Sequence, residues 1–416
     1  MINIGLFGVG TVGGSVVKEL EDQLGKFNKE SGQDIKIKKI VTKSGKKNLG
    51  NYEHSTNPSS IIDDEDIQIV VELIGGIDEA FDIIKRSLEK GKHVVTANKA
   101  VVDKYGVELQ EIAAQNKAYF MFEGAVGGGI PIINSLKVGL SGNKTKEIYG
   151  IINGTTNFIL TKMTKEGSSY EDALKEAQEL GYAEADPTYD VEGLDTAQKI
   201  SILASINFST KIDSENVDTK GITGVTAEDI QFASELGYRI KLIAVAREIN
   251  GGVDIRVSPM LVSKKHPLAH IDYSTNAVFL GGHTHVTLAG EGAGGNPTAS
   301  AVISDIKSVV LNLGRDYKAV KYFGNEKINI LGKDEISSEF YLNFHALNQP
   351  GVLNAISKIF SDRKVNIMQV IQKGRGEHVP LIIHVDKTPF KSMEDSLDLV
   401  DKSALKVESV YPILII

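Results

Sequence analysis

Hydrophobic residues in the first 130 positions follow two alternating patterns. Short apolar runs bounded by polar residues or glycine predict β-strands at residues 2–7, 35–41, 67–74, 93–96 and 118–122. Between these runs the spacing becomes helical, as in the apolar positions that recur every four residues from Val12 to Leu24. Strands that alternate with helices are typical of a parallel sheet with helices on both faces. We therefore expect an α/β domain over residues 1–130.

The middle of the chain loses this regular alternation. From about residue 131, helical patterns at 169–180 and 194–206 are mixed with a longer strand pattern at 241–249. The mixture predicts an α+β substrate-binding domain over residues 131–297. An apolar-periodic helix then covers about residues 298–315, and we expect it to return to the first domain.

Residues 338–416 show a third pattern. The predicted order is strand 339–346, helix 352–363, strands 366–374 and 379–385, helix 392–402 and strand 407–416. The order βαββαβ is that of a ferredoxin-like unit. We therefore expect a small, separate domain at this end of the chain.

Composition agrees with several domains and excludes some functions. A length of 416 residues predicts two or three domains, and 41% hydrophobic with 24% charged residues is ordinary for a globular protein. The net charge of −8 is modest, and both signs are interspersed, so we expect no nucleic-acid or membrane partner. The first strand starts at Ile2 without room for a signal peptide, and no apolar stretch approaches about 18 residues. These features predict a cytoplasmic protein.

The turn after the first strand carries the strongest chemical signal. Gly8-Val9-Gly10-Thr11-Val12-Gly13 is the G-x-G-x-x-G pattern, and a predicted strand precedes it and a predicted helix follows it. The first glycine permits a tight turn, the second lets the backbone approach a pyrophosphate, and the third allows the helix to pack closely on the strand. The helix N-terminus then offers its N–H groups to the phosphates. The expected dinucleotide contacts are Phe7, Gly8, Val9, Gly10, Thr11, Val12 and Gly13.

The chain contains no cysteine. Disulfides, thiolate metal sites and thiol nucleophiles are therefore excluded. An aldehyde dehydrogenase that works through a covalent thioester needs a cysteine nucleophile. A nicotinamide enzyme of this composition is thus expected to reduce a carbonyl directly or to oxidise an alcohol.

The end of the second predicted strand lacks a usual feature of dinucleotide-binding domains. The acidic residue expected about 20 positions after the glycines is missing, and the strand runs into the basic segment 42–47 instead. Cations and a hydroxyl suit the 2′-phosphate of NADP(H), whereas a carboxylate suits the ribose hydroxyl of NAD(H). We predict a preference for NADP(H) with Lys43 as the phosphate contact. A solvated basic turn is the alternative.

Two further stretches combine polar residues with buried-type segments. The strand at 93–96 ends in Thr96, followed closely by Lys99, and polar groups at such strand ends face the binding crevice of an open α/β sheet, so we expect both residues to contact the cofactor. A helix cap with an exposed lysine would look the same. Farther along, Asp195 and Lys199 lie four residues apart on a predicted helix, so they share one face. A surface ion pair is the alternative, but the acid-rich loop before the helix favours a polar pocket for an amino-acid-like substrate.

Two other groups of residues resemble metal sites, but each is better explained as a structural feature when it is considered alone. The run from Glu123 to Pro131 places a carboxylate beside a flexible backbone that is able to surround a hard cation, but its glycines favour a plain tight turn. His283 and His285 share one face of a strand without a third ligand at a diagnostic spacing. We interpret this pair as structural or facing solvent.

Together these stretches resemble homoserine dehydrogenase over nearly the whole chain. The matching motifs are the N-terminal GLFGVGTVGG, VVELIGG at 70–76, TANKA at 96–100, EGAVGGGIPII at 123–133, NGTTNFIL at 153–160, GYAEADPTYDVEGLDTAQK at 181–199 and GAGGNPTASAV at 292–302. The unit at 338–416, with NQPGVL at 348–353, is similar to an ACT domain, a small amino-acid-sensing module. The expected architecture is a Rossmann-type domain, an α+β substrate and dimerisation domain, and an ACT domain.

The resemblance implies an NAD(P)-dependent interconversion of L-homoserine and L-aspartate 4-semialdehyde on the route to threonine and methionine. It implies that Lys199 donates a proton to the carbonyl oxygen and that Lys99, a second catalytic lysine, contacts cofactor or substrate. The other implied contacts are two carboxylates that bind substrate and two glycines that line the cofactor, namely Glu184, Asp195, Gly181 and Gly292.

The resemblance also implies a cation, an effector and an oligomer. A structural sodium ion would be held by the Glu123 carboxylate and the backbone carbonyls of Val126, Gly128 and Ile130, which reverses the preference for a plain turn. ACT-like units bind effectors between subunits, so an amino acid such as L-threonine and a homodimer or homotetramer are implied.

Two rival functions fit the same residues. One is an NADP-dependent reductase of another small amino-acid carbonyl, and the other is a non-catalytic sensor of NADP and an amino acid. The presence of both lysines and both carboxylates disfavours the sensor. Assays with aspartate semialdehyde and close analogues separate the two enzymes.

Overall fold

The computed structural model describes residues 1–43 and 52–415, which form two compact units interleaved along the chain. Unit 1 contains residues 1–145, 198–216 and 276–327, and unit 2 contains residues 146–197, 217–275 and 328–416. The boundaries expected at 130, 297 and 338 stay predictions. Among the described residues, none of the helices combines the length and the hydropathy that a membrane span requires.

Unit 1 contains a six-stranded parallel sheet in the order β3-β2-β1-β4-β5-β6. This is the strand order of a Rossmann-type domain, so the predicted fold class is confirmed, and the order reverses between β1 and β4, where such folds bind ligands. The strands are β1 (Ile2–Phe7), β2 (Ile35–Val41), β3 (Glu53–Ser55), β4 (Ile67–Glu72), β5 (His93–Thr96) and β6 (Phe120–Met121).

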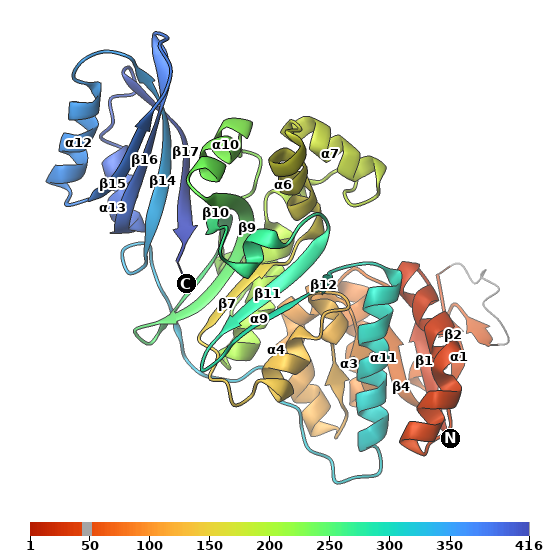
Figure 1. The fold of residues 1–416 in the computed structure, drawn as a ribbon. Helices are drawn as coiled ribbons and strands as arrows, with labels where there is room; N and C mark the ends of the chain where they lie inside the picture. Colours follow the sequence, from red (N-terminus) through yellow and green to blue (C-terminus); the bar gives the residue numbers. More distant parts are fainter. Residues whose placement is uncertain (44–51, 416) are drawn as a thin grey trace. The chain divides into compact units, whose positions relative to one another are not determined.

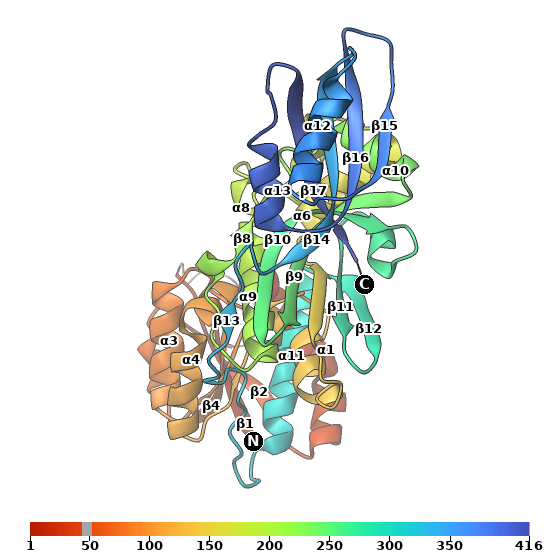
Figure 2. The same cartoon turned by 90° about the vertical axis from the view of Figure 1, so that its left-hand side faces the viewer.

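Helices cover both faces of this sheet. Figure 1 shows α1 (Thr11–Ser31) and α11 (Gly295–Asn312) side by side over one face. In Figure 2 the pair α3 (Asp78–Glu89) and α4 (Lys99–Gln115) lies on the other side of the sheet. The apolar positions of α1 that predicted the helix, such as Val16 and Leu20, are buried against the strands and against α11. Helix α11 thus packs against α1 and the strands within unit 1.

Several predicted element ends in unit 1 were wrong by a few residues. Strand β4 ends at Glu72 because its side chain turns back to accept the N–H of Ile74 at 2.8 Å. Strand β3 was missed since its three residues carry no apolar pattern. Helix α11 begins three residues before Thr298, with Pro297 in its first turn, where a missing N–H costs nothing.

Unit 1 also contains shorter elements. They are α2 (Ser59–Ile62), α5 (Ile132–Asn134), β11 (Thr275–Gly281), β12 (His285–Glu291) and single turns of other helical types at 123–125, 135–139 and 214–216. Helix α9 (Leu194–Asn207) begins in unit 2, and its residues from Gln198 onward belong to unit 1.

Unit 2 is built around a mixed sheet in the order β7-β9-β10-β17-β14-β16-β15. Its strands are β7 (Glu147–Ile151), β9 (Tyr238–Ile249), β10 (Gly252–Ser263), β14 (Ser337–Leu347), β15 (Ile367–Gln372), β16 (His378–Pro389) and β17 (Leu405–Leu414), with short β8 (Asp218–Thr219) and β13 (Asn329–Ile330) beside β10. Its helices are α6 (Gly154–Glu166), α7 (Tyr170–Glu179), α8 (Thr188–Val191), α10 (Ala227–Glu235), α12 (Val352–Asp362) and α13 (Phe390–Leu397), with a helical turn at 267–270.

The C-terminal part of unit 2 has the predicted βαββαβ order. Strands β17, β14, β16 and β15 form antiparallel neighbours, and Figure 1 shows α12 and α13 on one face of them. Apolar residues of both helices and of the strands form one core. The last helix was predicted too late in the chain, because β16 continues to Pro389 and α13 starts directly after this proline.

A buried carboxylate joins helix α10 to this C-terminal sheet. Asp229 is fully buried, and its Oδ1 accepts hydrogen bonds from Asn343 at 3.0 Å, Tyr341 at 3.2 Å and Ser409. Its Oδ2 accepts from Thr226, the residue that caps α10. Because so many donors pair with its oxygens, this buried polar group is tolerated in the core.

Candidate functional site

The glycine turn of unit 1 has the geometry that the sequence predicts. Gly8 has a φ of +88°, and a Cβ at Gly13 would lie 2.0 Å from the Gly8 carbonyl oxygen. A Cβ at Gly10, in contrast, would meet no atom within 4 Å, so the space above the turn is open. No side chain caps the N-terminus of α1, which begins here. The first and third glycines therefore serve the fold, while the second leaves room for a ligand beside the helix N-terminus.

Lys43 lies at the end of β2 in unit 1. Its side chain is 81% exposed, and its Nζ lies 2.8 Å from a carboxylate oxygen of Glu79, in the first turn of α3. The rest of the basic segment, Ser44 to Lys47, lies outside the described residues. Lys43 is thus available to an anion only by leaving an exposed ion pair, which is worth little.

The carboxyl ends of β4 and β5 in unit 1 are joined by a buried acid that the sequence analysis did not single out. Glu72 is fully buried, accepts the Thr96 hydroxyl at 2.7 Å, and burial raises the pKa of its carboxyl group. Thr96 also accepts the N–H of Asn98, whose side chain donates to the carbonyl of Gly76 at 2.7 Å. The Thr96 hydroxyl therefore connects the end of β4 with the backbone that follows β5. An acid at the end of the apolar run IQIVVE was the available signal.

Lys99 is the first residue of α4, and it is half-buried. The cap of this helix is Asn98, whose side-chain oxygen accepts the N–H of Val101 at 3.3 Å. The sequence left open that this segment is a helix cap with an exposed lysine, and the structure does contain a helix cap here. The cap is the asparagine, and the lysine follows it at the edge of the sheet where ligands bind.

Lys199 lies on the part of α9 that belongs to unit 1, and it is half-buried. Asp103 of α4 holds this part of the helix: it accepts the Ser201 hydroxyl at 2.8 Å and the Gln198 amide at 3.3 Å. It also accepts the Ser214 hydroxyl at 2.7 Å. Gln198 and Ser201, which lie one residue before and two residues after Lys199, are thus anchored to one buried carboxylate. The sequence gives no local signal for Asp103, because its partners lie about 100 residues away.

In unit 2, Asp190 and Asp195 of the acid-rich stretch 181–199 contact Asn153, the residue that caps α6. The Asn153 amide nitrogen donates to Asp190 at 2.7 Å and to Asp195 at 2.9 Å, while its oxygen accepts the N–H of Thr156 at 2.8 Å. Asp195, on the first turn of α9, is only 5% exposed. One amide therefore holds two carboxylates beside each other, a polar arrangement that suits a cationic group. Asn153 and Asp190 were missed as site residues.

Gly181 and Glu184 lie in the loop after α7 in unit 2. Gly181 has a φ of +77°, which explains the glycine, and no atom lies within 4 Å of a Cβ built on it. Glu184 is exposed, and its backbone carbonyl accepts the side chain of Gln178 at 3.1 Å. This structure gathers Asp195 with Asp190, but it leaves the Glu184 side chain on the surface of its loop.

The loop proposed for a cation lies entirely in unit 1. The Glu123 carboxylate accepts the N–H groups of Ile133 at 2.9 Å and Asn134 at 2.7 Å, and burial raises its pKa to about 7. Val126 and Gly128 are buried, and within residues 1–43 and 52–415 their carbonyls accept no hydrogen bond. Such carbonyls are suitable ligands for a hard cation. The Ile130 carbonyl, however, already accepts the N–H of Ile132.

Gly292 packs against the same loop. A Cβ at Gly128 would lie 2.6 Å from the Gly292 carbonyl carbon, and one at Gly292 would lie 1.9 Å from the Asn276 amide. Both positions therefore need glycine for close packing. The described residues contain no group of three or more histidines and acids suited to a metal ion. The His285 ring instead lies 5.3 Å from the Phe279 ring.

Comparisons with known proteins agree with this arrangement. Residues 8–123 match the family model of the NAD-binding domain of homoserine dehydrogenase, residues 131–306 match that of homoserine dehydrogenase, and residues 340–398 match the ACT domain. The chain is 39% identical to a homoserine dehydrogenase of Bacillus subtilis, with 98% of each chain covered, and 37% identical to one of Neisseria gonorrhoeae, with 99% covered.

Solved structures that superpose on this chain are also homoserine dehydrogenases. A homoserine dehydrogenase from Thiobacillus denitrificans superposes with a TM-score of 0.94 at 37% identity, covering 99% of this chain and 98% of that one. A hyperthermophilic archaeal homoserine dehydrogenase in complex with NADPH superposes with a TM-score of 0.64 at 30% identity, covering 76% of this chain and 99% of its own.

Proposed function

The chain belongs to the homoserine dehydrogenase family, oxidoreductases that act on a CH–OH group, and we propose that it interconverts L-homoserine and L-aspartate 4-semialdehyde with NADP(H). One observation carries the proposal: helix α9 bears the buried Asp195 carboxylate on its first turn and the Lys199 amine four residues later. A carboxylate suits the substrate ammonium group, and an ammonium suits the oxygen that gains or loses a proton.

The proposed roles follow from these positions. Lys199 donates a proton to the carbonyl oxygen during reduction and accepts it back during oxidation. Its ammonium stabilises the negative charge that develops on that oxygen. Asp195 and Glu184 bind the substrate ammonium, and Lys99 contacts cofactor or substrate at the edge of the sheet. When NADP(H) is bound beside Gly10, Gly181 and Gly292, its nicotinamide supplies or accepts the hydride.

A coupled assay tests this function. The purified chain is expected to oxidise NADPH in the presence of L-aspartate 4-semialdehyde and to reduce NADP with L-homoserine. Close analogues of the aldehyde serve as controls for specificity. If an analogue is reduced much faster than aspartate semialdehyde, the chain is a reductase of a different amino-acid carbonyl. If NADPH binds and no substrate is reduced, the catalytic proposal fails.

We further propose that NADP(H) is preferred over NAD(H) through Lys43. In support, the described end of β2 offers this cation and no carboxylate, and one neighbour was solved in complex with NADPH. The ratio of kcat/KM for NADPH to that for NADH should fall about tenfold in Lys43→Ala, as expected for the loss of a charged contact worth about 1.4 kcal/mol. The exposed Lys26→Ala serves as a control. An unchanged ratio in Lys43→Ala would reject the assignment.

A structural sodium ion is proposed at the loop from Glu123 to Ile130. The buried Val126 and Gly128 carbonyls and the buried Glu123 carboxyl group of the same loop support it. Because an ion that binds only the folded state stabilises it, the melting temperature should rise with sodium chloride more than with choline chloride at equal ionic strength. Equal melting temperatures in the two salts would contradict the site.

An effector amino acid, L-threonine, and a homodimer or homotetramer complete the proposal. The ACT domain at 340–398 supports an amino-acid effector. Analytical ultracentrifugation measures the subunit number, and the NADPH assay with and without threonine measures inhibition. A monomer whose activity threonine does not change would overturn both statements.

A further inference from the structure

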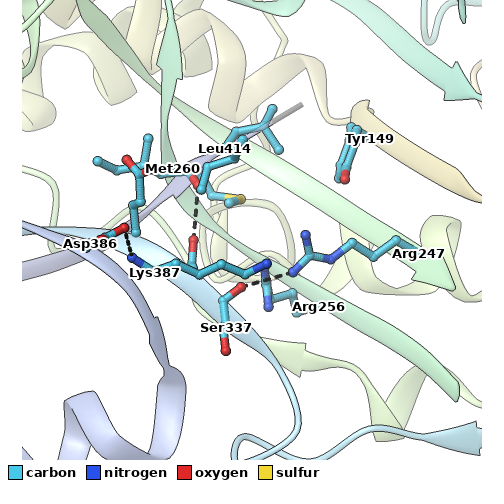
Figure 3. A pocket seen from close by; sticks show the side chains of 12 residues that line it. Tyr149, Arg247, Arg256, Met260, Ser337, Asp386, Lys387 and Leu414 are labelled. Carbon is cyan, nitrogen blue, oxygen red and sulfur yellow. Dashed lines mark hydrogen bonds between the residues drawn. The ribbon is translucent and has the colours of Figure 1, made fainter. Parts of the chain in front are cut away.

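A cavity of about 290 Å³ lies in unit 2 where β14, β16 and β17 meet β9 and β10. Its polar lining includes two arginines, Arg247 of β9 and Arg256 of β10, and one lysine, Lys387 of β16. Figure 3 shows the nitrogen-bearing ends of these three side chains gathered in the same part of the cavity. None of the three has a part in the proposed reaction. The volume is just below the usual range of about 300–1,000 Å³ for small-molecule sites, so only a small ligand would fit.

The two arginines share a single buried counter-ion. The Asp254 carboxylate accepts from Arg247 at 2.7 Å through one oxygen and from Arg256 at 3.1 Å through the other, and its side chain is 1% exposed. Arg247 and Asp254 lie directly opposite each other in the β9–β10 ladder, and Arg256 follows two residues later on the same face. Two guanidinium groups thus share one carboxylate on this side of the cavity.

Arg256 has a donor without an acceptor. Its side chain is only 4% exposed, yet the Nε has no hydrogen-bond partner among the described residues. The guanidinium packs 4.4 Å from the ring centroid of Phe390, which fixes its plane but accepts no hydrogen bond in that plane. A buried donor of this kind is costly unless something pairs with it. An oxygen acceptor in the cavity would satisfy it.

The same cavity also has acidic residues on its lining. Glu339 lies 2.9 Å from His384, and Asp386 accepts the N–H of Lys387 at 2.7 Å. These carboxylates would repel a dianion but attract an ammonium group. The apolar part of the lining is formed by Met260, Ile413, Leu414 and Ile415. We propose that this cavity binds a small zwitterionic carboxylate, such as an α-amino acid, with its carboxylate on Arg256, Arg247 and Lys387.

Titration calorimetry on the full chain tests the site with named probes. L-valine and L-threonine are the zwitterions, acetate is a carboxylate without an ammonium group, and inorganic phosphate is a multiply charged oxyanion. At least one amino acid should bind saturably, acetate should bind more weakly, and phosphate weakest. Tighter binding of phosphate than of both amino acids would overturn the assignment, and so would no saturable binding of either amino acid.

Variants connect the binding to this cavity. Lys387 is exposed, so Lys387→Ala should fold normally and weaken amino-acid binding about tenfold, as for the loss of a charge-assisted hydrogen bond. Arg256→Gln should weaken it further. The control Lys391→Ala removes a lysine of α13 that pairs with Asp395 outside the cavity, and it should bind like the parent. Equal affinities in Lys387→Ala and the parent chain would place the ligand elsewhere.

The proposed amino-acid site and the proposed enzyme activity are tested independently of each other. Lys387→Ala should keep its NADPH-dependent turnover without effector within about twofold, because this residue takes no part in the reaction. A chain that binds the amino acid at this cavity but turns over no aspartate semialdehyde would contradict only the proposed function. A chain that turns over the semialdehyde but binds no amino acid would contradict only the site.

Discussion

The glycine turn of unit 1 and the Asn153 cluster of unit 2 present their proposed ligand-binding groups in different ways. At the turn, the useful groups are backbone atoms, and Gly8, Gly10 and Gly13 act through the absence of a side chain. Around Asn153, the useful groups are side chains, and one amide holds the carboxylates of Asp190 and Asp195 in place. The first site depends on local backbone conformation, and the second depends on contacts between distant segments.

This difference predicts different responses to substitution. A backbone site should fail when a side chain is added, even a methyl group. A side-chain site should fail when a polar group is removed or when its support is lost. The experiments on Lys199, on the two glycines and on Asn153 test this contrast.

The largest expected effect concerns the side-chain chemistry itself. Lys199→Ala should lower kcat by about 10²–10⁴-fold, because the proposed proton donor is removed, while NADPH should still bind at the unchanged glycine turn. Stopped-flow turnover and NADPH fluorescence titration measure the two properties separately. The control is Lys26→Ala, an exposed lysine on α1. Near-normal turnover in Lys199→Ala would remove this residue from the mechanism.

A pair of glycine substitutions tests the backbone site. In Gly13→Ala the new Cβ would lie 2.0 Å from the Gly8 carbonyl, so the free energy of unfolding should fall by about 1–3 kcal/mol, along with cofactor affinity. Gly10→Ala meets no protein atom within 4 Å, so its stability should stay within about 0.5 kcal/mol while NADPH binding weakens. Denaturant unfolding and NADPH titration distinguish the two. Normal NADPH affinity in Gly10→Ala would show that the pyrophosphate lies elsewhere.

Asn153→Ala tests the side-chain cluster. The cap of α6 is lost, which should cost about 0.5–2 kcal/mol of stability, and the two carboxylates lose the donor that holds them. The KM for homoserine should therefore rise more than kcat falls. Ser169→Ala is the control, because it removes the cap of α7 without touching the cluster. If both variants change KM equally, Asn153 acts only as a helix cap.

The smallest expected effect is a pH dependence in unit 2. Lys241 donates to Asn157 at 2.9 Å, and burial lowers its pKa to about 8 from 10.5. Between these values the unfolded chain binds more protons than the folded chain, so this residue makes stability rise with pH, by at most about 1.4 kcal/mol per pH unit. Lys241→Met should lack that rise in unfolding curves between pH 8 and 10. The exposed Lys264→Met should keep it, and parallel curves for the parent and Lys241→Met would refute the pKa shift.

Much of the fold was predictable, and the errors have physical causes. The alternation of strands and helices in unit 1 and the βαββαβ unit follow from apolar periodicity, which burial imposes directly. Element ends were less certain, since they depend on single contacts such as the Glu72 carboxylate on Ile74 N–H. The candidate site was predictable where motifs carry it. Glu72, Asp103 and Asn153 were missed, because their roles depend on partners far away in the sequence.

The sequence alone determined the glycine turn, the order of strands and helices, and the absence of thiol chemistry. Each of these depends on neighbouring residues or on composition, so no tertiary information is needed. Only the tertiary structure decided which polar side chains meet, as Asp103 does with Ser201 of α9 and Asp229 does with Tyr341 and Asn343. Such meetings depend on which segments pack together, and a buried charge is tolerated only where packing brings its partners.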